Sequence, residues 1–219
     1  MNMTMTKQGL LVTALLAVCT AAQAQFTVGA QYGITSSRTD ATPDGLNNHY
    51  GIFGEWQSGF KFLSLAISWN AGTLSGGTKE SANDLYYSNK YNQGDLQIKV
   101  FPLRTFANSD SSKVLYYTSG LYVAGGFGLL GSRTTIHELP TGNFRYQGNY
   151  TGTDYVVPLS VGIDIPLRKA FQQKGFSINL KYQANYCLSD KIDGYDPDLV
   201  SNKRKDVYTM ATIGLSYSF

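Results

Sequence analysis

Apolar and polar residues alternate along the last segment of the chain, residues 207–219. Ile213, Leu215 and Phe219 fall on one face of this segment, whereas Gly214 and small polar residues fall on the other. A period of two residues is the pattern of a β-strand whose two faces have different surroundings. The segment is therefore predicted to be a strand with one apolar face and one face of small polar residues.

The same alternation recurs along the chain and predicts eight strands. No long segment carries the spacing of an amphipathic helix, and glycines and short polar runs separate the alternating stretches. This pattern is typical of an all-β chain of one domain. The predicted strands cover residues 26–36, 49–57, 60–71, 92–103, 114–131, 153–165, 176–188 and 207–219. Because Pro158 cannot donate to a strand ladder, we expect a bulge there or a position near the rim.

The connections between these strands alternate in length. In an up-and-down antiparallel barrel every second connection lies at the same end, so the long loops share one rim. An even strand number, short periplasmic turns and long extracellular loops are typical of bacterial outer-membrane barrels. We therefore expect both termini in the periplasm. The long connections cover residues 36–48, 72–91, 132–152 and 189–206, and the shorter ones cover 58–59, 104–113 and 167–175.

The small residues on the polar faces indicate which face looks outward. An eight-stranded barrel has an interior just wide enough for side chains, and residues such as Gly29, Gly33, Ser64 and Gly126 suit such a crowded lumen. A surface in water usually carries Lys and Glu, so the apolar faces are expected to contact lipid. The alternative is a soluble periplasmic barrel with an apolar pocket. Aromatic residues near strand ends are predicted to form girdles at the headgroups: Tyr50, Trp56, Trp69, Tyr155, Tyr186 and Tyr217.

The first 24 residues have the pattern of a cleavable signal peptide. Lys7 supplies the positive charge, residues 10–19 the apolar core and residues 22–24 (Ala-Gln-Ala) the cleavage site. The domain division is thus 1–24 for the signal peptide and 25–219 for the barrel. A lipoprotein signal ending at Cys19 is the alternative, but its Val18 is bulky where that motif has a small residue. Cleavage leaves Cys187 as the only cysteine, which excludes an internal disulfide and a cysteine-based metal cluster.

Composition narrows the class further. Only 15% of residues are charged, against roughly 25% in ordinary globular proteins. The mature chain is nearly neutral and shows no concentrated basic face, so nucleic-acid binding is not expected. After residue 24 no apolar run approaches the ~18 to 20 residues of a transmembrane helix, and a β-barrel is then the remaining way to span a bilayer.

Taken together, the signal peptide, the alternating strands, the alternating connection lengths and the terminal Tyr217-Ser218-Phe219 resemble the small OmpA-like, or porin-family, outer-membrane β-barrels. The resemblance covers the mature chain. It implies that Tyr217 and Phe219 form part of the signal read by the barrel-assembly machinery, and that outer-membrane lipid and lipopolysaccharide are partners. Because no C-terminal peptidoglycan-binding domain is expected, the wall-anchoring role of longer family members is not carried over.

Charged residues on the polar faces predict a plugged lumen. An isolated buried charge is costly, so charges of both signs in a narrow interior should pair. Asp164 and Lys181 come near diagonal register across the connection 167–175. The rival hypothesis is a narrow ion path. The residues with lumen parity are Glu55, Asp95, Lys99, Asp164 and Lys181.

Three loop features carry weaker hypotheses. Asp190, Asp193, Asp196 and Asp198 do not match the spacing of a calcium loop and are expected to be solvated. The basic run 203–205 either contacts lipopolysaccharide phosphates or is solvated or paired with those aspartates. Tyrosines in the predicted loops form either a partner-binding surface or contacts among the loops: Tyr86, Tyr87, Tyr91, Tyr146 and Tyr150.

Catalysis is not expected. The mature chain has only His49 and His137, and neither lies in a His-x-Ser arrangement. The sequence therefore predicts an integral outer-membrane barrel without enzymatic activity or cofactor and with a structural or surface-interaction role, whose extracellular loop partner is unknown. The alternatives are a narrow channel, a lipid-modifying enzyme and a secretion-linked barrel.

Overall fold

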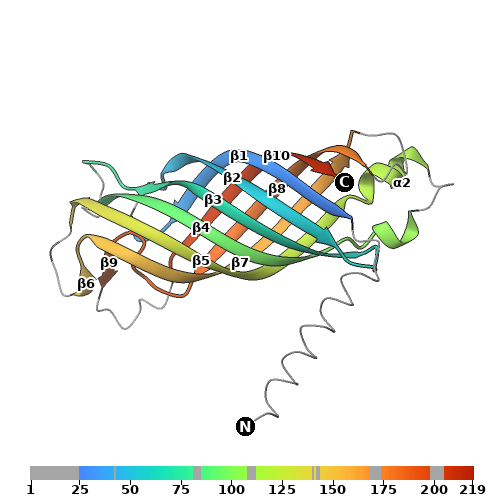
Figure 1. Cartoon of the computed structure of the whole chain (residues 1–219). Helices are drawn as coiled ribbons and strands as arrows, with labels where there is room; N and C mark the ends of the chain where they lie inside the picture. Colours follow the sequence, from blue (N-terminus) through green and yellow to red (C-terminus); the bar gives the residue numbers. More distant parts are fainter. Residues whose placement is uncertain are drawn as a thin grey trace, which may run out of the picture.

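Eight antiparallel strands close a barrel in the computed structural model, which describes residues 25–41, 43–80, 85–107, 112–139, 141, 144–167, 174–197 and 205–219. The order around the barrel is β1-β10-β8-β7-β5-β4-β3-β2, so each strand neighbours the preceding and following barrel strand (Figure 1). The predicted eight-stranded up-and-down barrel is confirmed. The predicted signal peptide, 1–24, lies outside the described residues. The strands are β1 (Phe26–Arg38), β2 (Leu46–Gln57), β3 (Leu63–Gly76), β4 (Tyr86–Val100), β5 (Leu121–Glu138), β7 (Tyr150–Pro166), β8 (Gly175–Cys187) and β10 (Val207–Ser218).

The first and last barrel strands form the closing seam. Ala30 of β1 lies opposite Leu215 of β10 on one side and Ile52 of β2 on the other. At the end of the seam the backbone N–H of Phe219 donates to the carbonyl oxygen of Phe26 at 2.9 Å. The residues near both chain ends thus lie at one end of the barrel, here called the terminal end.

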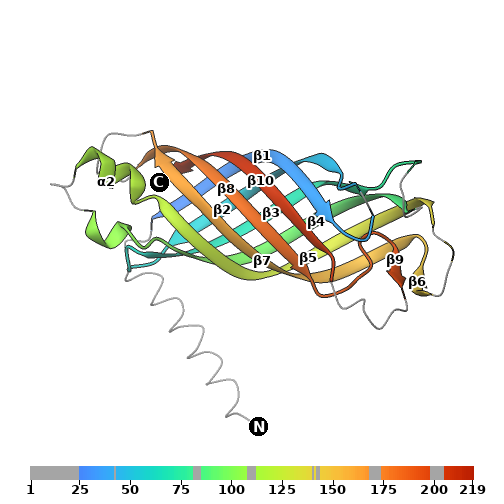
Figure 2. The ribbon, with the colours of Figure 1, turned by 180° about the vertical axis from the view of Figure 1, so that it is seen from behind.

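The opposite end, here called the loop end, carries a small second sheet. β6 (Phe144–Gln147) pairs with β9 (Tyr195–Pro197). Figures 1 and 2 show β6 and β9 at this end, and α2 with the carboxyl terminus at the other. The connections that join the strands at the loop end are therefore partly ordered as sheet.

Several strands extend further toward the loop end than the sequence predicts. β4 begins at Tyr86 rather than 92, and β5 continues to Glu138 rather than 131. The β5 extension begins with polar residues on both faces, as Ser132 and Thr134 inside alternate with Arg133 outside, whereas the inward residues of the β4 extension include Tyr87 and Tyr91. Backbone pairing continues there, but no hydrophobic alternation marks it.

The start of the predicted strand 114–131 is wrong. Residues Lys113–Thr118 form the short helix α2, and β5 begins only at Leu121. The Ser112 hydroxyl oxygen accepts the backbone N–H of Leu115 and caps this helix. The connection 104–113 also contains a 3-10 turn, η1 (Arg104–Phe106). None of the helices in the described ranges is long and apolar enough to cross a membrane.

Pro158 lies in the middle of β7, and the expected bulge is absent. The pairing of β7 with β5 keeps the same register on both sides, with Gly128 opposite Val156 and Gly125 opposite Leu159. The ladder between them omits residues 126 and 127, so the sheet accommodates the missing N–H by interrupting the pairing rather than by adding a residue.

Candidate functional site

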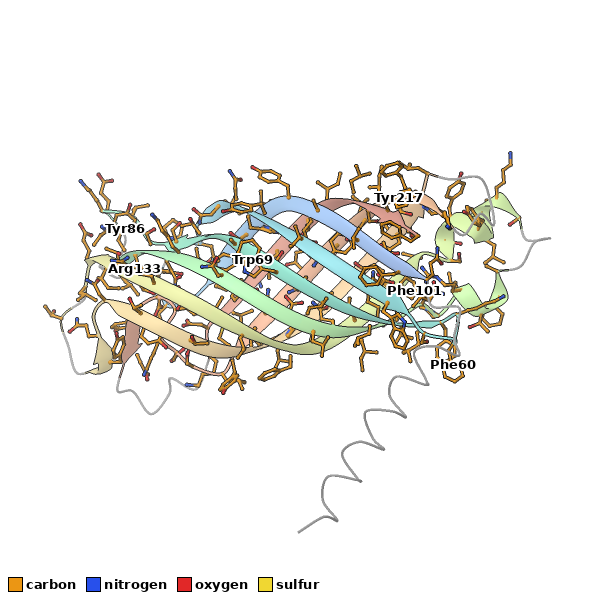
Figure 3. The ribbon with its side chains drawn as sticks, viewed as in Figure 1. Phe60, Trp69, Tyr86, Phe101, Arg133 and Tyr217 are labelled. Atoms are coloured by element: carbon orange, nitrogen blue, oxygen red, sulfur yellow. The ribbon has the colours of Figure 1, made fainter. Side chains whose placement is uncertain are left out.

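The outward face of the barrel is an exposed apolar belt. Outward side chains such as Ile52, Val123 and Leu215 are more than half exposed, at 61%, 55% and 53%. Figure 3 shows side chains projecting outward along the length of the barrel wall. The apolar face of each strand therefore points outward and the polar face points inward, which is the reverse of a soluble barrel.

The predicted girdle residues all lie on this outward face. Tyr50 and Trp69 are exposed and meet edge to face, with ring centroids 6.4 Å apart. Tyr155 and Tyr186 are exposed, whereas Trp56 and Tyr217 are half-buried. The Tyr217 ring packs against Phe219 with ring centroids 5.1 Å apart.

The interior contains a triad of charged side chains, here called the lysine triad. Lys99 Nζ lies 2.6 Å from Glu55 Oε2 and 3.0 Å from Asp164 Oδ2. The ammonium group also lies 3.9 Å from the centre of the Tyr122 ring. All three charged side chains are at least four-fifths buried. Such a desolvated ion cluster is tolerated because each charge has a partner of opposite sign.

Asp95 is held by amides and a hydroxyl rather than by a cation. Its carboxylate accepts hydrogen bonds from Ser68 Oγ at 3.0 Å, Gln93 Nε2 at 3.1 Å and Gln97 Nε2 at 2.6 Å. These amides continue across the lumen, since Gln97 Nε2 also donates to Gln183 Oε1 at 3.1 Å. The network crosslinks opposite walls of the barrel.

Lys181 is the remaining lumen charge. It lies opposite Gly162 in the register of β7 and β8, two residues from the position opposite Asp164. The Asp164 carboxylate binds Lys99 and Asn179 instead, and Lys181 makes no hydrogen bond or ion pair to the described residues. Its side chain lines a space of about 30 Å³ together with Asp95 and Lys99.

An apolar cluster fills the lumen at the loop end. Ile192, from the connection between β8 and β10, inserts into it and is 1% exposed. Its carbonyl oxygen accepts from Asn89 Nδ2 at 2.8 Å and Thr134 Oγ1 at 2.7 Å, and its N–H donates to Asp206 Oδ2 at 2.9 Å. This cluster, here called the apolar seal, comprises Leu74, Tyr91, Leu130, Val156, Cys187, Ile192, Tyr208 and Met210.

A cavity of about 720 Å³ opens at the terminal end. Its lining includes Glu55 and Asp164 of the lysine triad, Arg104 of η1 and Tyr116 of α2. The lumen is thus hollow at the terminal end, crossed by hydrogen bonds in its middle and filled by apolar side chains at the loop end.

Two solved structures of bacterial proteins share this architecture. Neisserial surface protein A matches with a TM-score of 0.50 and 9% identity over 89% of this chain and 97% of its own. Ail, the attachment invasion locus protein of Yersinia pestis, in complex with the heparin analogue sucrose octasulfate, matches with a TM-score of 0.50 and 10% identity over 90% of this chain and 99% of its own. The chain has the fold of these small outer-membrane barrels. No protein-family model matches the chain, and no curated protein matches its sequence.

Within this outer-membrane fold, the aspartates of the connection between β8 and β10 are buried. Asp190, Asp193 and Asp206 are only 7%, 1% and 4% exposed, so the expectation of a solvated loop is wrong for Asp190 and Asp193. Asp193 accepts the N–H of Asp40 at 3.3 Å and that of Tyr195 at 3.0 Å. The buried carboxylates therefore fix the backbone of the loop end.

This burial perturbs their titration. Desolvation raises the pKa of Asp190 to about 6, with Lys205 acting in the opposite sense and Asp196 in the same sense. Desolvation likewise raises the pKa values of Asp193 and Asp206. The negative charges of the neighbouring Asp40 and Asp190 raise both pKa values further. No group of three or more His, Cys, Asp or Glu side chains in the described ranges could hold a metal ion. Asp198, Lys203 and Arg204 lie outside those ranges.

The loop tyrosines do not form one surface on this barrel. Tyr87 and Tyr91 are inward residues of β4, 0% and 2% exposed, so the hypothesis of a partner-binding surface is wrong for these two. Tyr86 faces outward and stacks on His137 with ring centroids 4.7 Å apart. Tyr146 and Tyr150 meet edge to face at 6.2 Å.

The two histidines lie on opposite sides of the barrel wall. His49 is buried in the lumen, where its Nε2 lies 3.1 Å from Thr212 Oγ1. His137 faces outward. Among the described residues, no hydrogen bond joins either histidine to a serine or a carboxylate.

Sequence reasoning missed the apolar seal, although a signal for it was present. Leu130, Tyr208 and Met210 are large residues on faces that otherwise carry Gly, Ser and Thr. Large apolar side chains with lumen parity predict a filled interior at their level. To predict that these side chains meet in one cluster, the register between several strands must also be known, and the alternation within one strand does not give that register.

Proposed function

We propose that the chain is an integral outer-membrane protein without catalytic activity, whose closed barrel serves a structural or surface-interaction role. The observation that carries this proposal is the combination of an apolar outer belt with a lumen closed by the lysine triad and the apolar seal. The belt requires a lipid environment. The closed lumen supports a role for the barrel itself and its loops rather than for a pore.

The height of the belt fits a bilayer. On β5 the outward apolar residues extend from Leu121 to Leu129. At ~3.4 Å per residue and a tilt of ~40°, this segment rises roughly 21 Å along the barrel axis. Outer-membrane barrels have an apolar band about 25 Å tall, so the belt is close to the expected height.

The proposed orientation places both termini in the periplasm and the loop end outside the cell. The small sheet of β6 and β9 and the long connection between β8 and β10 lie at the loop end, and long outer loops are typical of outer-membrane barrels. The expected alternation of connection lengths is wrong at one place, because the connection between β4 and β5, which contains η1 and α2, is as long and lies at the terminal end. In this orientation Phe219, which is 57% exposed, and Tyr217 lie at the periplasmic rim. There the barrel-assembly machinery would read them during insertion, and the outer rim would face lipopolysaccharide.

Gel mobility tests the membrane proposal. Detergent-solubilised protein is compared before and after boiling, since a folded membrane barrel keeps its compact shape until it is heated. We expect a shift between the two samples. The absence of a shift, together with solubility in detergent-free buffer, would instead support a soluble barrel.

Planar-bilayer recording tests the closed lumen. The cavity of about 720 Å³ stops at the lysine triad, and the apolar seal fills the lumen beyond it. We therefore expect no steady current from the reconstituted protein. Steady single-channel currents that vanish in Lys181→Met would establish a narrow ion path and overturn the closed-lumen proposal.

A further inference from the structure

Two basic side chains face outward beside each other on the loop-end side of the apolar belt. Lys90 of β4 lies directly opposite Arg133 of β5, and both are exposed. Figure 3 shows Arg133 near the loop end beside Tyr86, with Trp69 closer to the middle of the barrel. Neither the Lys90 side chain nor the Arg133 side chain makes a hydrogen bond or an ion pair to the described residues.

This pairing is unfavourable without a ligand. Like charges directly opposite each other on a sheet destabilise it. On the adjacent strands Thr73 lies opposite Lys90 and Thr151 lies opposite Arg133, so neither register partner is a carboxylate that compensates the charge. A bound anion would remove the repulsion.

Two outward positions without side chains leave open space between this basic pair and the belt, and this space is here called the hollow. Its floor is formed by two outward glycines, Gly131, which lies opposite Asn92, and Gly94, which lies opposite Trp69 and Leu129. A Cβ added at Gly94 would meet no atom within 4 Å, and one at Gly131 would meet only a backbone oxygen at 3.7 Å. These positions therefore have open space above them.

Close packing does not explain these two glycines. At Gly126, which lies on β5 where the wall is crowded, a Cβ would lie only 1.9 Å from the carbonyl oxygen of Leu96. Gly94 and Gly131 have no such neighbour, and neither has the positive φ that favours glycine. Because glycine in a strand interior is destabilising relative to Ala, what these two residues provide is the hollow itself.

We propose that Lys90 and Arg133 bind the phosphate of an anionic lipid headgroup, and that the hollow over Gly94 and Gly131 accommodates the adjoining part of that lipid. The guanidinium group of Arg suits bidentate phosphate binding and Lys adds a second charge. Trp69 lies beside Gly94 on one side of the hollow. On the other side Leu129 lies beside Gly94, and Tyr155 lies beside Leu129. The site rests on the proposed membrane insertion and adds to it a specific lipid contact.

The level of the pair agrees with this ligand. Lys90 is four residues along β4 from Gly94, which lies in the row of Trp69 and Tyr155. Four residues of a tilted strand rise roughly 10 Å along the axis. Aromatic girdles lie at the membrane interface, and the headgroup region extends about 5 to 8 Å beyond the hydrocarbon core on each side. The basic pair therefore lies at the outer edge of the headgroups, where phosphates are found.

The test is binding of purified lipid A, the phosphorylated lipid of lipopolysaccharide, to the full mature chain in non-ionic detergent, measured by native mass spectrometry. Each basic residue near an anionic lipid surface contributes about a fivefold change in affinity, so Lys90→Gln with Arg133→Gln should weaken binding about 30-fold. Lys113→Gln with Lys174→Gln removes the same charge at the terminal end and should leave affinity unchanged. Dephosphorylated lipid A should bind the unmodified chain as weakly as phosphorylated lipid A binds the double variant.

A second variant tests the hollow separately from the charge. Gly94→Val fills the hollow but keeps both basic side chains, and it should weaken lipid A binding while leaving the boiling-dependent gel shift intact. Inorganic phosphate, which needs no hollow, should bind Gly94→Val and the unmodified chain equally.

The proposal is overturned if the Lys90 and Arg133 double variant keeps the affinity of the unmodified chain, if the terminal-end control loses as much, or if dephosphorylated lipid A binds equally well. A change in oligomeric state in the double variant, with unchanged lipid binding, would assign the patch to a second copy of the chain. Insertion into zwitterionic vesicles is measured in parallel. A chain that inserts but does not select lipid A refutes this site alone, whereas a chain that does not insert refutes the membrane proposal as well.

Discussion

The connection between β8 and β10 docks into the lumen at the loop end through Ile192, and this docking should weaken as pH rises. The docked segment is held by the Ile192 N–H, which donates to Asp206 Oδ2 at 2.9 Å, and by Asp193, which accepts from Tyr195 N at 3.0 Å. Burial raises the pKa of Asp190 from 3.8 to about 6 and raises that of Asp193 in the same direction. Protons are thus bound more tightly in the docked state than in a solvated, undocked segment.

The sign of the effect follows from this difference. A carboxyl group with a raised pKa stabilises docking fully below its ordinary value near 3.8, and that stabilisation is lost as pH rises through about 6. At ~1.4 kcal/mol per pKa unit, the shift of Asp190 sets an upper limit of roughly 3 kcal/mol; solvent screening of the carboxylate reduces this to about 1.4 kcal/mol, or about a tenfold change in the docking equilibrium. Asp193 acts in the same direction and extends the loss to higher pH.

Amide hydrogen exchange measures this equilibrium directly. After correction for the intrinsic pH dependence of exchange, protection of the Ile192 and Tyr195 amides should fall about tenfold between pH 4 and pH 8. Amides in the middle of the β8–β10 ladder, such as Leu180, serve as the control and should keep their protection. Asp190→Asn should flatten the pH dependence of Ile192. Protection that is constant or rises with pH in the unmodified chain would refute the reasoning.

Three further predictions concern the lumen, the seam and assembly. Lys99→Met leaves the two carboxylates of the lysine triad without a cation, and the free energy of unfolding in vesicles, measured with urea, should fall by about 3 to 5 kcal/mol; an unchanged value would mean that the triad is not desolvated. Gly33→Ala would place a Cβ 2.0 Å from the carbonyl oxygen of Ala211 across the seam, so the folded fraction in a gel-shift assay should fall sharply, whereas Gly94→Ala, with no atom within 4 Å, should fold normally. Phe219→Ala keeps the backbone hydrogen bond to β1, so it should lower the amount of barrel in the outer membrane of cells more than the yield of refolding in vesicles; equal losses in both assays would argue against an assembly signal.

Hydrophobic alternation predicted the strands wherever lipid contacts one face. Ile213 and Leu215 differ sharply from Gly214 because a bilayer and a crowded lumen select different side chains. Above the belt that selection disappears, so the polar ends of β4 and β5 were read as loops. The helix α2 was read as strand because residues 114–117 are apolar or aromatic without a clear period.

The alternation of inward and outward positions along each strand predicted which charged side chains enter the lumen, but not which of them pair. Asp164 and Lys181 are close in the register of β7 and β8, yet the Asp164 carboxylate binds Lys99 from β4. That pairing depends on the strand stagger and on the lengths of side chains that cross the lumen. An alternation pattern carries neither quantity, so the lysine triad emerges only from the closed barrel.

The two closures of the lumen differ in chemistry and act in series. An ion that enters the cavity at the terminal end first meets the lysine triad, where Lys99 already satisfies both carboxylates. Beyond the hydrogen-bonded middle it meets the apolar seal, where Tyr91, Leu130 and Met210 are at most 2% exposed. Since charge is costly in an apolar environment without a partner, the seal opposes ions of both signs. Charged residues in a barrel lumen therefore do not by themselves indicate a channel, because one dry layer elsewhere along the axis is enough to close it.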